Sequence, residues 1–301
     1  MSSPTTTDCR AIANHLRSES RSSARQSELI VSAHPPHKPN VLELFLAALG
    51  SPFVIVGEQF REIFKVFGLT VQYALHGRRR WKEVWLQAYR IGNESLVFIV
   101  CVAGSLGVTL VYQAGLQAER IIGDLTPLGG LYLQILLREF GPTITALMIS
   151  TRVGTGIAAE IGSMVVTEQV DALQMSGAHP VEYLVVPRFW ASVVMVFCLT
   201  CVSVLVSWLA GLLTALLAFG VSPYTFATLS FVIPGDVILL LMKTTAYGIA
   251  IPIVAGASGL SAHGGSEGVG WATTQSVVNC SLAVLFLDVL LSGFGYLVLL
   301  R

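Results

Sequence analysis

Charge is scarce in this sequence. Only 12% of the 301 residues are Asp, Glu, Lys or Arg, whereas 53% are hydrophobic and the mean hydropathy is +0.71. A soluble domain carries about 25% charged residues, so the composition excludes an ordinary soluble protein and predicts an all-α, polytopic membrane protein. Helices are the expected spanning elements because their backbone groups are satisfied within each segment.

Motifs for several chemistries are also missing. The chain contains no GxxxxGK[ST] loop, so it is not expected to bind ATP, and it contains no HExxH or close His/Cys/acid cluster that predicts a metal site. Cys198 and Cys201 have C-x-x-C spacing inside an apolar segment, where packing is a better interpretation than redox or metal chemistry. We therefore expect no catalytic residue, no metal and no cofactor on this chain.

Residues 1–40 lack the apolar core of a signal peptide and are rich in Ser, Thr, Arg, His and Pro. They predict a disordered cytoplasmic tail, with an organellar transit peptide as the alternative. Residues 1–90 hold 12 Lys+Arg and 7 Asp+Glu, a charge of +5, and the remaining residues carry −5. This asymmetry places the N-terminus on the cytoplasmic side of a membrane.

Residues 41–75 are apolar but interrupted by charges, and Phe60, Ile63, Phe64 and Phe67 recur at helical spacing. That pattern predicts an amphipathic helix lying in the membrane interface. The basic patch HGRRRWK at 76–82, with Trp81 and Trp85, is typical of an anchor at the cytoplasmic surface. We favour that interpretation over nucleic-acid binding and expect no nucleic-acid partner.

Five membrane-length segments follow, and each approximates the roughly 20 residues that a helix needs to cross a bilayer. They are Ser95–Gly115, Leu128–Ser150, Phe189–Phe219, Val237–Leu260 and Val277–Leu300. With the N-terminus inside, the 151–188 loop is cytoplasmic and the 116–127 loop lies outside.

Ionisable residues gather between Arg138 and Arg188, in and after the second predicted span. Residues 152–176 show a helical pattern that predicts a short cytoplasmic helix docking into a soluble partner, with a solvated loop as the alternative. Within the spans, Arg138, Glu139, Lys243 and Asp288 are intramembrane charges, which are costly and therefore functional candidates. Arg138 and Glu139 either line the polar end of a cavity or join two protomers; the alternative is a structural pairing with Lys243 or Asp288.

The motifs of this region resemble those of the MlaE/YrbE permease family, the membrane subunits of Mce-associated ABC transporters. They are REFGP (138–142), RVG (152–154), AAEIGSM (158–164), TEQVDAL (167–173) and PRFWA (187–191), with GVGWATTQSVV (268–278), SLAVL (281–285), Asp288 and Lys243 further along. The resemblance covers about residues 45–300, whereas GASG (256–259) departs from the family pattern.

This resemblance implies a permease domain over 41–301 and a homodimer in the bacterial inner membrane. It further implies a cytoplasmic ABC ATPase that holds ATP and Mg, a periplasmic MCE-domain protein, and a STAS-domain subunit as an optional addition. The cargo would be phospholipid or a related lipid moving between the inner and outer membranes. The 152–176 helix would be the coupling helix, with Arg152, Glu160, Met164, Thr167, Glu168 and Asp171 as ATPase-coupling residues.

A lipid cavity needs an apolar lining with few polar groups. We expect Leu110, Val111, Ala114 and Ala118, at the outer end of the first span, to contribute to it, although ordinary packing is the alternative for each residue. Two other classes remain open from the residues alone. An ion-coupled secondary transporter predicts internal repeats, and a non-transporting membrane scaffold leaves the charged loop without a partner.

Overall fold

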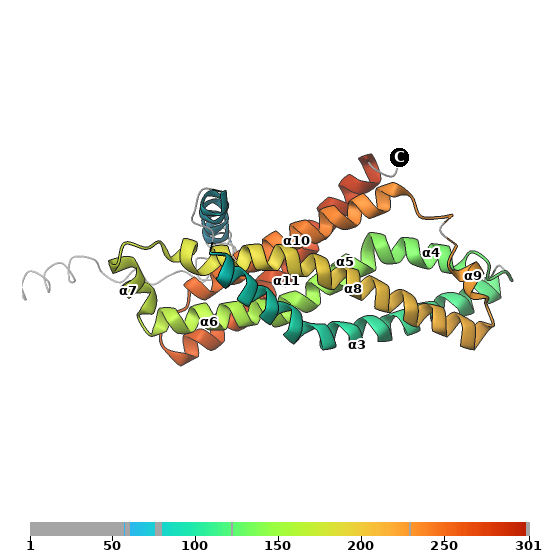
Figure 1. Cartoon of the computed structure of the whole chain (residues 1–301), viewed down its shortest axis with the longest axis horizontal. Coiled ribbons are helices and arrows are strands. Elements are labelled where there is room, and N and C mark those ends of the chain that lie inside the picture. The colour runs from blue at the N-terminus through green and yellow to red at the C-terminus, as the bar shows by residue number, and fades with distance from the viewer. Residues whose placement is uncertain (1–56, 58–60, 76–79, 122, 229, 299–301) are drawn as a thin grey trace, which may run out of the picture. The chain divides into compact units, whose positions relative to one another are not determined.

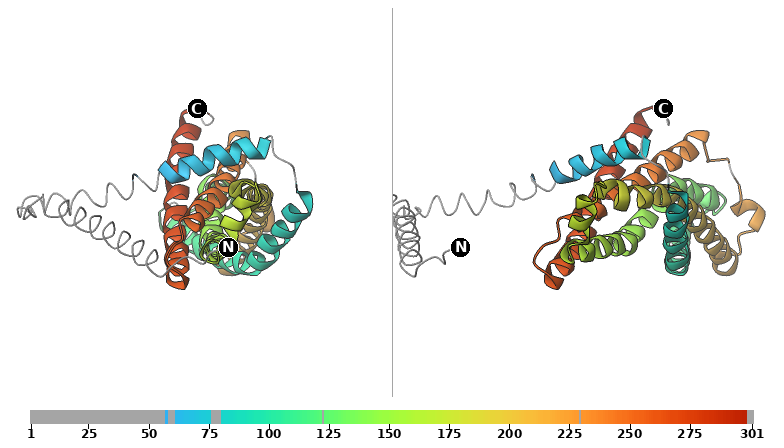
Figure 2. Two further views of the ribbon diagram at one scale, coloured as in Figure 1. Left: turned by 90° about the vertical axis from the view of Figure 1, so that its left-hand side faces the viewer. Right: turned by 60° about the vertical axis from the view of Figure 1, so that its left-hand side comes forward.

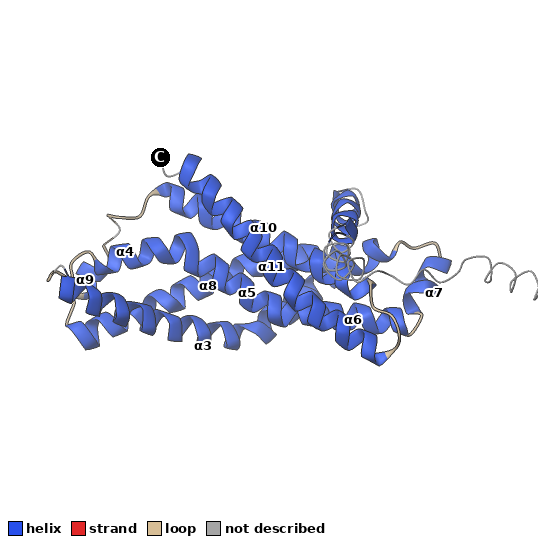
Figure 3. Ribbon diagram, turned by 180° about the vertical axis from the view of Figure 1, so that it is seen from behind, coloured by secondary structure: helices blue, strands red, loops and turns tan. Residues whose placement is uncertain are grey.

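A computed structural model describes residues 57, 61–75, 80–121, 123–228 and 230–298. In this part of the chain the structure consists of helices and loops alone (Figure 3). Five helical columns are long and apolar enough to cross a membrane, which confirms the all-helical prediction with five spans. The predicted tail 1–40, most of 41–60, and part of the basic patch at 76–82 lie outside the described residues.

Each column extends beyond the apolar segment predicted from the sequence. The first is α3 (Trp81–Ile121), and the second runs through α4 (Leu128–Ile135), η1 (Leu136–Phe140), α5 (Gly141–Ile149), η2 (Ser150–Gly154) and α6 (Thr155–Val166). The others are η3 (Val181–Val185) with α8 (Val186–Phe219), α10 (Pro234–Leu260) and α11 (Ser266–Val298); short helices α7 (Gln169–Met175) and α9 (Pro223–Phe226) connect them. Polar turns thus continue the helices past the apolar runs.

The predicted coupling helix 152–176 is divided in two, so this prediction was wrong about its continuity. Its first part, α6, ends the second column and buries Ile157 and Ile161 against the bundle. The helix stops at Thr167, and Glu168 adopts a left-handed conformation with φ of 60° before α7 begins. A docking segment separate from the span is therefore only α7 and its flanking turns.

The helix of residues 61–75 is amphipathic, with one side buried on the bundle and another exposed. Val66, Thr70 and Ala74 form its buried side and pack beside α8 and α10, whereas Phe64 and Phe67 are exposed. Figure 2 shows this helix, in light blue, running across the direction of the long columns. The exposed phenylalanines suit an apolar surrounding, and the interfacial location stays a prediction.

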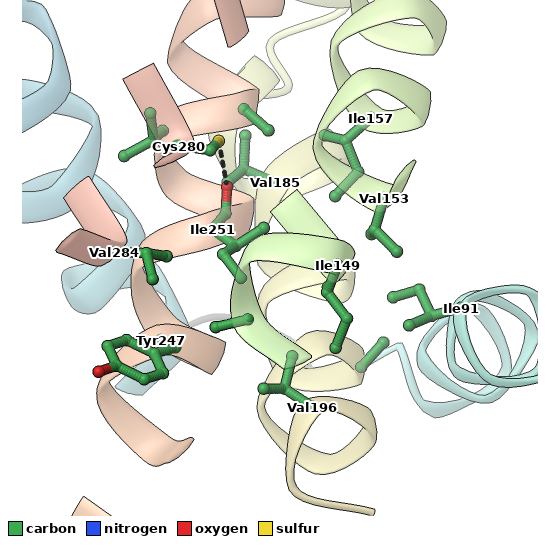
Figure 4. Close-up of a cluster of buried hydrophobic side chains, with 14 of the residues drawn as sticks. Ile91, Ile149, Val153, Ile157, Val185, Val196, Tyr247, Ile251, Cys280 and Val284 are labelled. Atoms are coloured by element: carbon green, nitrogen blue, oxygen red, sulfur yellow. Dashed lines mark hydrogen bonds between the residues drawn. The ribbon is translucent and has the colours of Figure 1, made fainter. Parts of the chain in front are cut away.

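Close helix packing forms the bundle. α3 lies along α8 (Figure 1), and a Cβ atom on Gly107 would lie 2.3 Å from the carbonyl oxygen of Ser207, so only glycine permits this approach. α10 and the second column are the most enclosed of the five, and α10 packs against α6, α8 and α11. The main core lies between these helices, where Tyr247, Ile251 and Cys280 meet Ile149 and Val185 (Figure 4).

Successive columns run in alternating directions, so the loops gather at two ends of the bundle (Figure 1). We call the end that carries α7 the α7 end, and the end that carries α9 the α9 end. Residues 123–127 lie at the α9 end, and the loop after α10 lies at the α7 end. This alternation agrees with the predicted arrangement of the loops.

Candidate functional site

The second column is interrupted by a π-helical turn at its charged residues. Arg138 and Glu139 lie in η1, and Pro142 follows in the first turn of α5. Proline has no N–H, so Pro142 cannot donate the α-helical hydrogen bond to the carbonyl of Arg138. That carbonyl instead accepts a hydrogen bond from the Lys243 Nζ atom at 2.9 Å. The local sequence thus opens a backbone acceptor toward α10.

Lys243 is the centre of a buried ion network. Its side chain is fully buried, and its Nζ atom lies 2.7 Å from Glu139 Oε2 and 2.8 Å from Asp288 Oδ1. A charged group in an apolar interior is strongly unfavourable unless opposite charges and hydrogen bonds compensate it. Two carboxylates and one carbonyl provide that compensation for Lys243, and they join the second column to α10 and α11.

Arg138 points to a different partner. Its Nε atom donates to Asp236 Oδ1, and the Asp236 side chain is fully buried. Asp236 lies in the first turn of α10, where its Oδ2 atom accepts from the amide of Ile233 at 2.9 Å. A carboxylate at a helix N-terminus is favourable because it meets the unpaired amides and the positive end of the dipole. The same residue therefore caps α10 and binds Arg138.

Hydroxyl groups complete the network. Asp288 Oδ1 accepts hydrogen bonds from Thr143 and Tyr247 at 2.8 and 2.7 Å, and Ser292 donates to Glu139 at 3.1 Å. The described residues of this network therefore include three carboxylates and two cations. Asp288 and Glu139 are therefore hydrogen-bonded by hydroxyl groups as well as ion-paired with Lys243, and these donors further stabilise the negative charge of the carboxylates.

The structure brings together all four intramembrane charges that the sequence singled out. Glu139 pairs with Lys243, and Lys243 also pairs with Asp288, whereas the adjacent Arg138 and Glu139 take separate partners. Sequence reasoning missed Asp236, whose only local signal is its place just after Pro234 and Gly235 at a helix start. Thr143, Tyr247 and Ser292 carried no signal, since uncharged hydroxyls are common in spans.

An apolar pocket of about 360 Å³ lies at the α9 end, between α3 and α4. Three of the four predicted lipid-lining residues border it: Leu110, Ala114 and Ala118. Val111 does not, because it is buried in a cluster with Tyr132 and Leu136. Phe140 also lines the pocket and directly follows Glu139, so the ion network lies close to one limit of the pocket.

The loop beside this pocket is ordered by Asp124. Its Oδ1 atom accepts from the Thr126 hydroxyl at 2.6 Å and from the Thr126 amide at 2.9 Å. These donors hold the pKa of the Asp124 carboxyl below its ordinary value, because they stabilise the charged form. Pro127, the next residue, lines the pocket, so the turn positions one of its walls.

The predicted coupling residues fall into two groups at the α7 end. Arg152, Glu160 and Met164 belong to the second column: Glu160 Oε2 lies 2.8 Å from the buried Arg188, and Met164 packs against the core. Thr167 and Glu168 form the break, and Asp171 is exposed on α7. Only this second group lies on a separate, exposed segment.

Several curated proteins are similar to this chain. A probable ABC transporter permease protein of Synechocystis is 36% identical over 77% of this chain and 90% of its own length. The intermembrane phospholipid transport system permease protein MlaE of Haemophilus influenzae is 32% identical, over 84% of this chain and 97% of its own length. Protein TRIGALACTOSYLDIACYLGLYCEROL 1, chloroplastic, of Arabidopsis thaliana is 29% identical over 77% of this chain and 66% of that protein.

Five apolar columns and these relatives define the class of the protein: it is a permease of the ABC-transporter type, a transport subunit rather than an enzyme. The Permease MlaE family matches residues 84–294, which include nearly all of the five columns and the whole of the ion network and the apolar pocket. The chain belongs to the MlaE permease family, as the motifs from Arg138 onward indicated.

Proposed function

We propose that this permease moves phospholipid, or a related lipid, between the inner and outer membranes of a bacterium. The observation that carries the proposal is the apolar pocket at the α9 end, in a chain whose Haemophilus relative is named for intermembrane phospholipid transport. Its volume of about 360 Å³ is at the small end of ligand pockets, which are about 300–1,000 Å³. One protomer thus offers room for part of an acyl chain rather than a whole lipid.

The pocket of one protomer is too small for a whole lipid, which supports a site that a second copy of the chain completes. A homodimer would place two such pockets in one assembly, and Glu139 and Arg138 keep 31% and 16% of their side chains exposed for contacts outside the protomer. In this proposal the ion network sets the polar limit of the cavity. Structural pairing alone is the competing role for these residues.

Energy would come from a separate cytoplasmic ABC ATPase that binds ATP and Mg. The α7 segment supports that contact, because it is exposed, carries Asp171 and leaves Met175 85% exposed, while Val170 anchors it in the core. An exposed methionine suits a docking surface, because methionine is enriched at interfaces and adapts its shape to a partner. Thr167 and Glu168 would set the angle between this segment and the column.

The remaining partners follow from the family resemblance. We propose an MCE-domain protein on the periplasmic side, near the pocket, and a STAS-domain subunit as an optional cytoplasmic component. The N-terminus would be cytoplasmic in the bacterial inner membrane, which the positive charge of residues 1–90 supports. In that orientation the α7 end is cytoplasmic and the α9 end is periplasmic.

Filling the pocket tests the proposal. Ala118→Trp should occupy it and lower the amount of phospholipid that copurifies with the permease–ATPase complex, and also lower ATP-dependent lipid transfer in vesicles. Leu213→Phe is the matched control, since Leu213 is exposed on α8 and does not line the pocket.

Unchanged lipid binding and transfer with Ala118→Trp would overturn the pocket assignment. Transfer driven by an ion gradient without ATPase would support a secondary transporter instead, and a chain that neither binds lipid nor recruits an ATPase would support a scaffold.

A further inference from the structure

A second pocket, of about 240 Å³, lies at the α7 end between α3 and the end of the second column. Its charged lining consists of Arg90 and Glu94 from α3, Arg152 from η2 and Glu160 from α6. Both pockets border α3, with Ile91 at one and Ala114 at the other. Over these 23 residues a helix rises about 35 Å at 1.5 Å each, so the pockets are separated by roughly the thickness of a bilayer.

The charges around this pocket leave a positive excess. Glu160 is tightly bound to Arg188 at 2.8 Å, whereas Arg90 is 3.6 Å from Glu160 and Arg152 is 3.9 Å from Glu94. The lining itself holds two arginines and two glutamates, but Arg188, which lies outside the lining, already neutralises Glu160, so Arg90 and Arg152 face only the charge of Glu94. Arg90 and Arg152 are only loosely paired and half exposed, so both are available to an anion.

A buried hydroxyl points to the same conclusion. Ser95 lines the pocket, is 2% exposed, and its Oγ atom has no hydrogen-bond partner within the described residues. A buried polar group without a partner is unfavourable and calls for an explanation. An oxygen-rich anion held by Arg90 and Arg152 would accept a hydrogen bond from this hydroxyl.

The pocket lies at the depth where lipid phosphates are found. Glu94 is the last charge on α3 before Glu119, near the other end of the helix, and the apolar segment 95–115 begins directly after it. Trp85 and Tyr89 are exposed on the preceding turns, and Val97 is exposed on the following one. Exposed aromatic residues followed by exposed aliphatic ones mark the boundary between headgroups and hydrocarbon.

We infer that this pocket binds the phosphate of a membrane phospholipid from the leaflet at the α7 end, with Arg90 and Arg152 as ligands and Ser95 as a further donor. Its volume suits a phosphate and part of a headgroup, so the acyl chains would remain outside along the apolar part of α3. The bound phosphate would join α3 to η2, the turn that leads into α6. This site is separate from the cargo pocket and does not require that its lipid be transported.

Native mass spectrometry of the delipidated permease tests the inference, with dioleoylphosphatidylglycerol as the probe and dioleoylglycerol, which lacks phosphate, as the comparison. Ala118→Trp serves as the background, so that the α9-end pocket does not contribute. Arg90→Gln and Arg152→Gln should each weaken phosphatidylglycerol binding by about tenfold, because each removes a charge-assisted hydrogen bond. Arg120→Gln, at the other end of α3, is the matched control and should bind normally.

Glu94→Gln supplies a readout that a structural role would not give. Removing this carboxylate frees Arg152 and should strengthen phosphatidylglycerol binding, whereas a role in stability alone would make all three substitutions act in the same direction. Thermal unfolding in detergent checks that the variants are folded.

Equal binding of dioleoylglycerol, or binding unaffected by both arginine substitutions, would overturn the site. Displacement of the lipid by millimolar inorganic phosphate would assign the pocket to a soluble anion rather than a lipid. The two proposals can fail separately, because Ala118→Trp should lower lipid transfer while phosphatidylglycerol still binds to the pocket at the α7 end.

Discussion

Lys243 donates a hydrogen bond to the carbonyl that Pro142 leaves without its α-helical donor. The acceptor is the backbone oxygen of Arg138, 2.9 Å from the ammonium group. A proline inside an apolar column would ordinarily leave an unsatisfied carbonyl, which is costly in a membrane. Here the fully buried lysine on α10 satisfies it, so the backbone irregularity and the buried charge stabilise each other.

Pro142→Ala should weaken this contact. Alanine restores an N–H that competes with Lys243 for the Arg138 carbonyl and favours a regular helix through η1. We expect reduced lipid transfer in vesicles with a change in stability within about 1 kcal/mol, because alanine is also the better helix former. Transfer equal to that of the unmodified protein would show that the irregular turn is not needed for transport.

Lys243→Met should destabilise the bundle. It leaves Glu139 and Asp288 without their shared cation, and removing one partner of a buried ion pair costs about 3–5 kcal/mol. Unfolding of the purified protein in detergent measures the effect. Adding Asp288→Asn to Lys243→Met should recover part of the loss, and a double variant no more stable than the single one would contradict the pairing.

Arg138→Ala and Glu139→Ala test whether the network serves transport as well as stability. We expect both to lower phospholipid transfer while the protein still inserts into the membrane and copurifies with its ATPase. Asp236→Asn separates the two roles, since it keeps an acceptor for the Ile233 amide but removes the negative charge facing Arg138. Full transfer in both alanine variants would reduce the network to a structural element.

Glu168→Gly should hold or raise stability, because Glu168 has a φ of 60° and glycine adopts that conformation without strain. The gain should be about 1 kcal/mol, as expected for one non-glycine residue in the left-handed region. If the Glu168 carboxylate contacts the ATPase, ATPase stimulation should fall in the same variant. A clear loss of stability would contradict the strain argument.

Gly107→Ala should separate α3 from α8. The added Cβ atom would lie 2.3 Å from the Ser207 carbonyl oxygen, so the helices must move, at a cost of about 1–3 kcal/mol. Gly104→Ala is the matched control one turn away, where the nearest atom lies 3.7 Å from the new methyl group. Thermal unfolding should distinguish the two variants, and equal stability would refute the close approach.

The five spans were predictable because long apolar segments have few alternatives in a chain with so little charge. Their ends were not, since polar turns such as Trp81–Glu94 continue a helix once neighbours pack against it. The charged partners of Lys243, Glu139 and Asp288, were predictable because all three residues are charges within apolar segments. Asp236 was not, because its approach to Arg138 depends on how the 220–233 connection places the start of α10.

The division of 152–176 shows the limit of periodicity. Ile157 and Ile161 have the spacing of an amphipathic docking helix, yet they are fully packed residues of the bundle. Periodicity reports an apolar face and does not say what covers it. The break at Glu168 carries no glycine or proline, so the sequence offered no stop signal there.

The π turns η1 and η2 change how residues along the second column can be compared. Each widens one helical turn by about one residue, which rotates everything beyond it by roughly 100° relative to a regular α-helix. A helical wheel drawn from Leu128 to Val166 therefore assigns Glu160 to the wrong side relative to Glu139. A relative with a regular helix in place of either turn would align only with a one-residue gap inside a membrane span, where gaps are usually treated as errors.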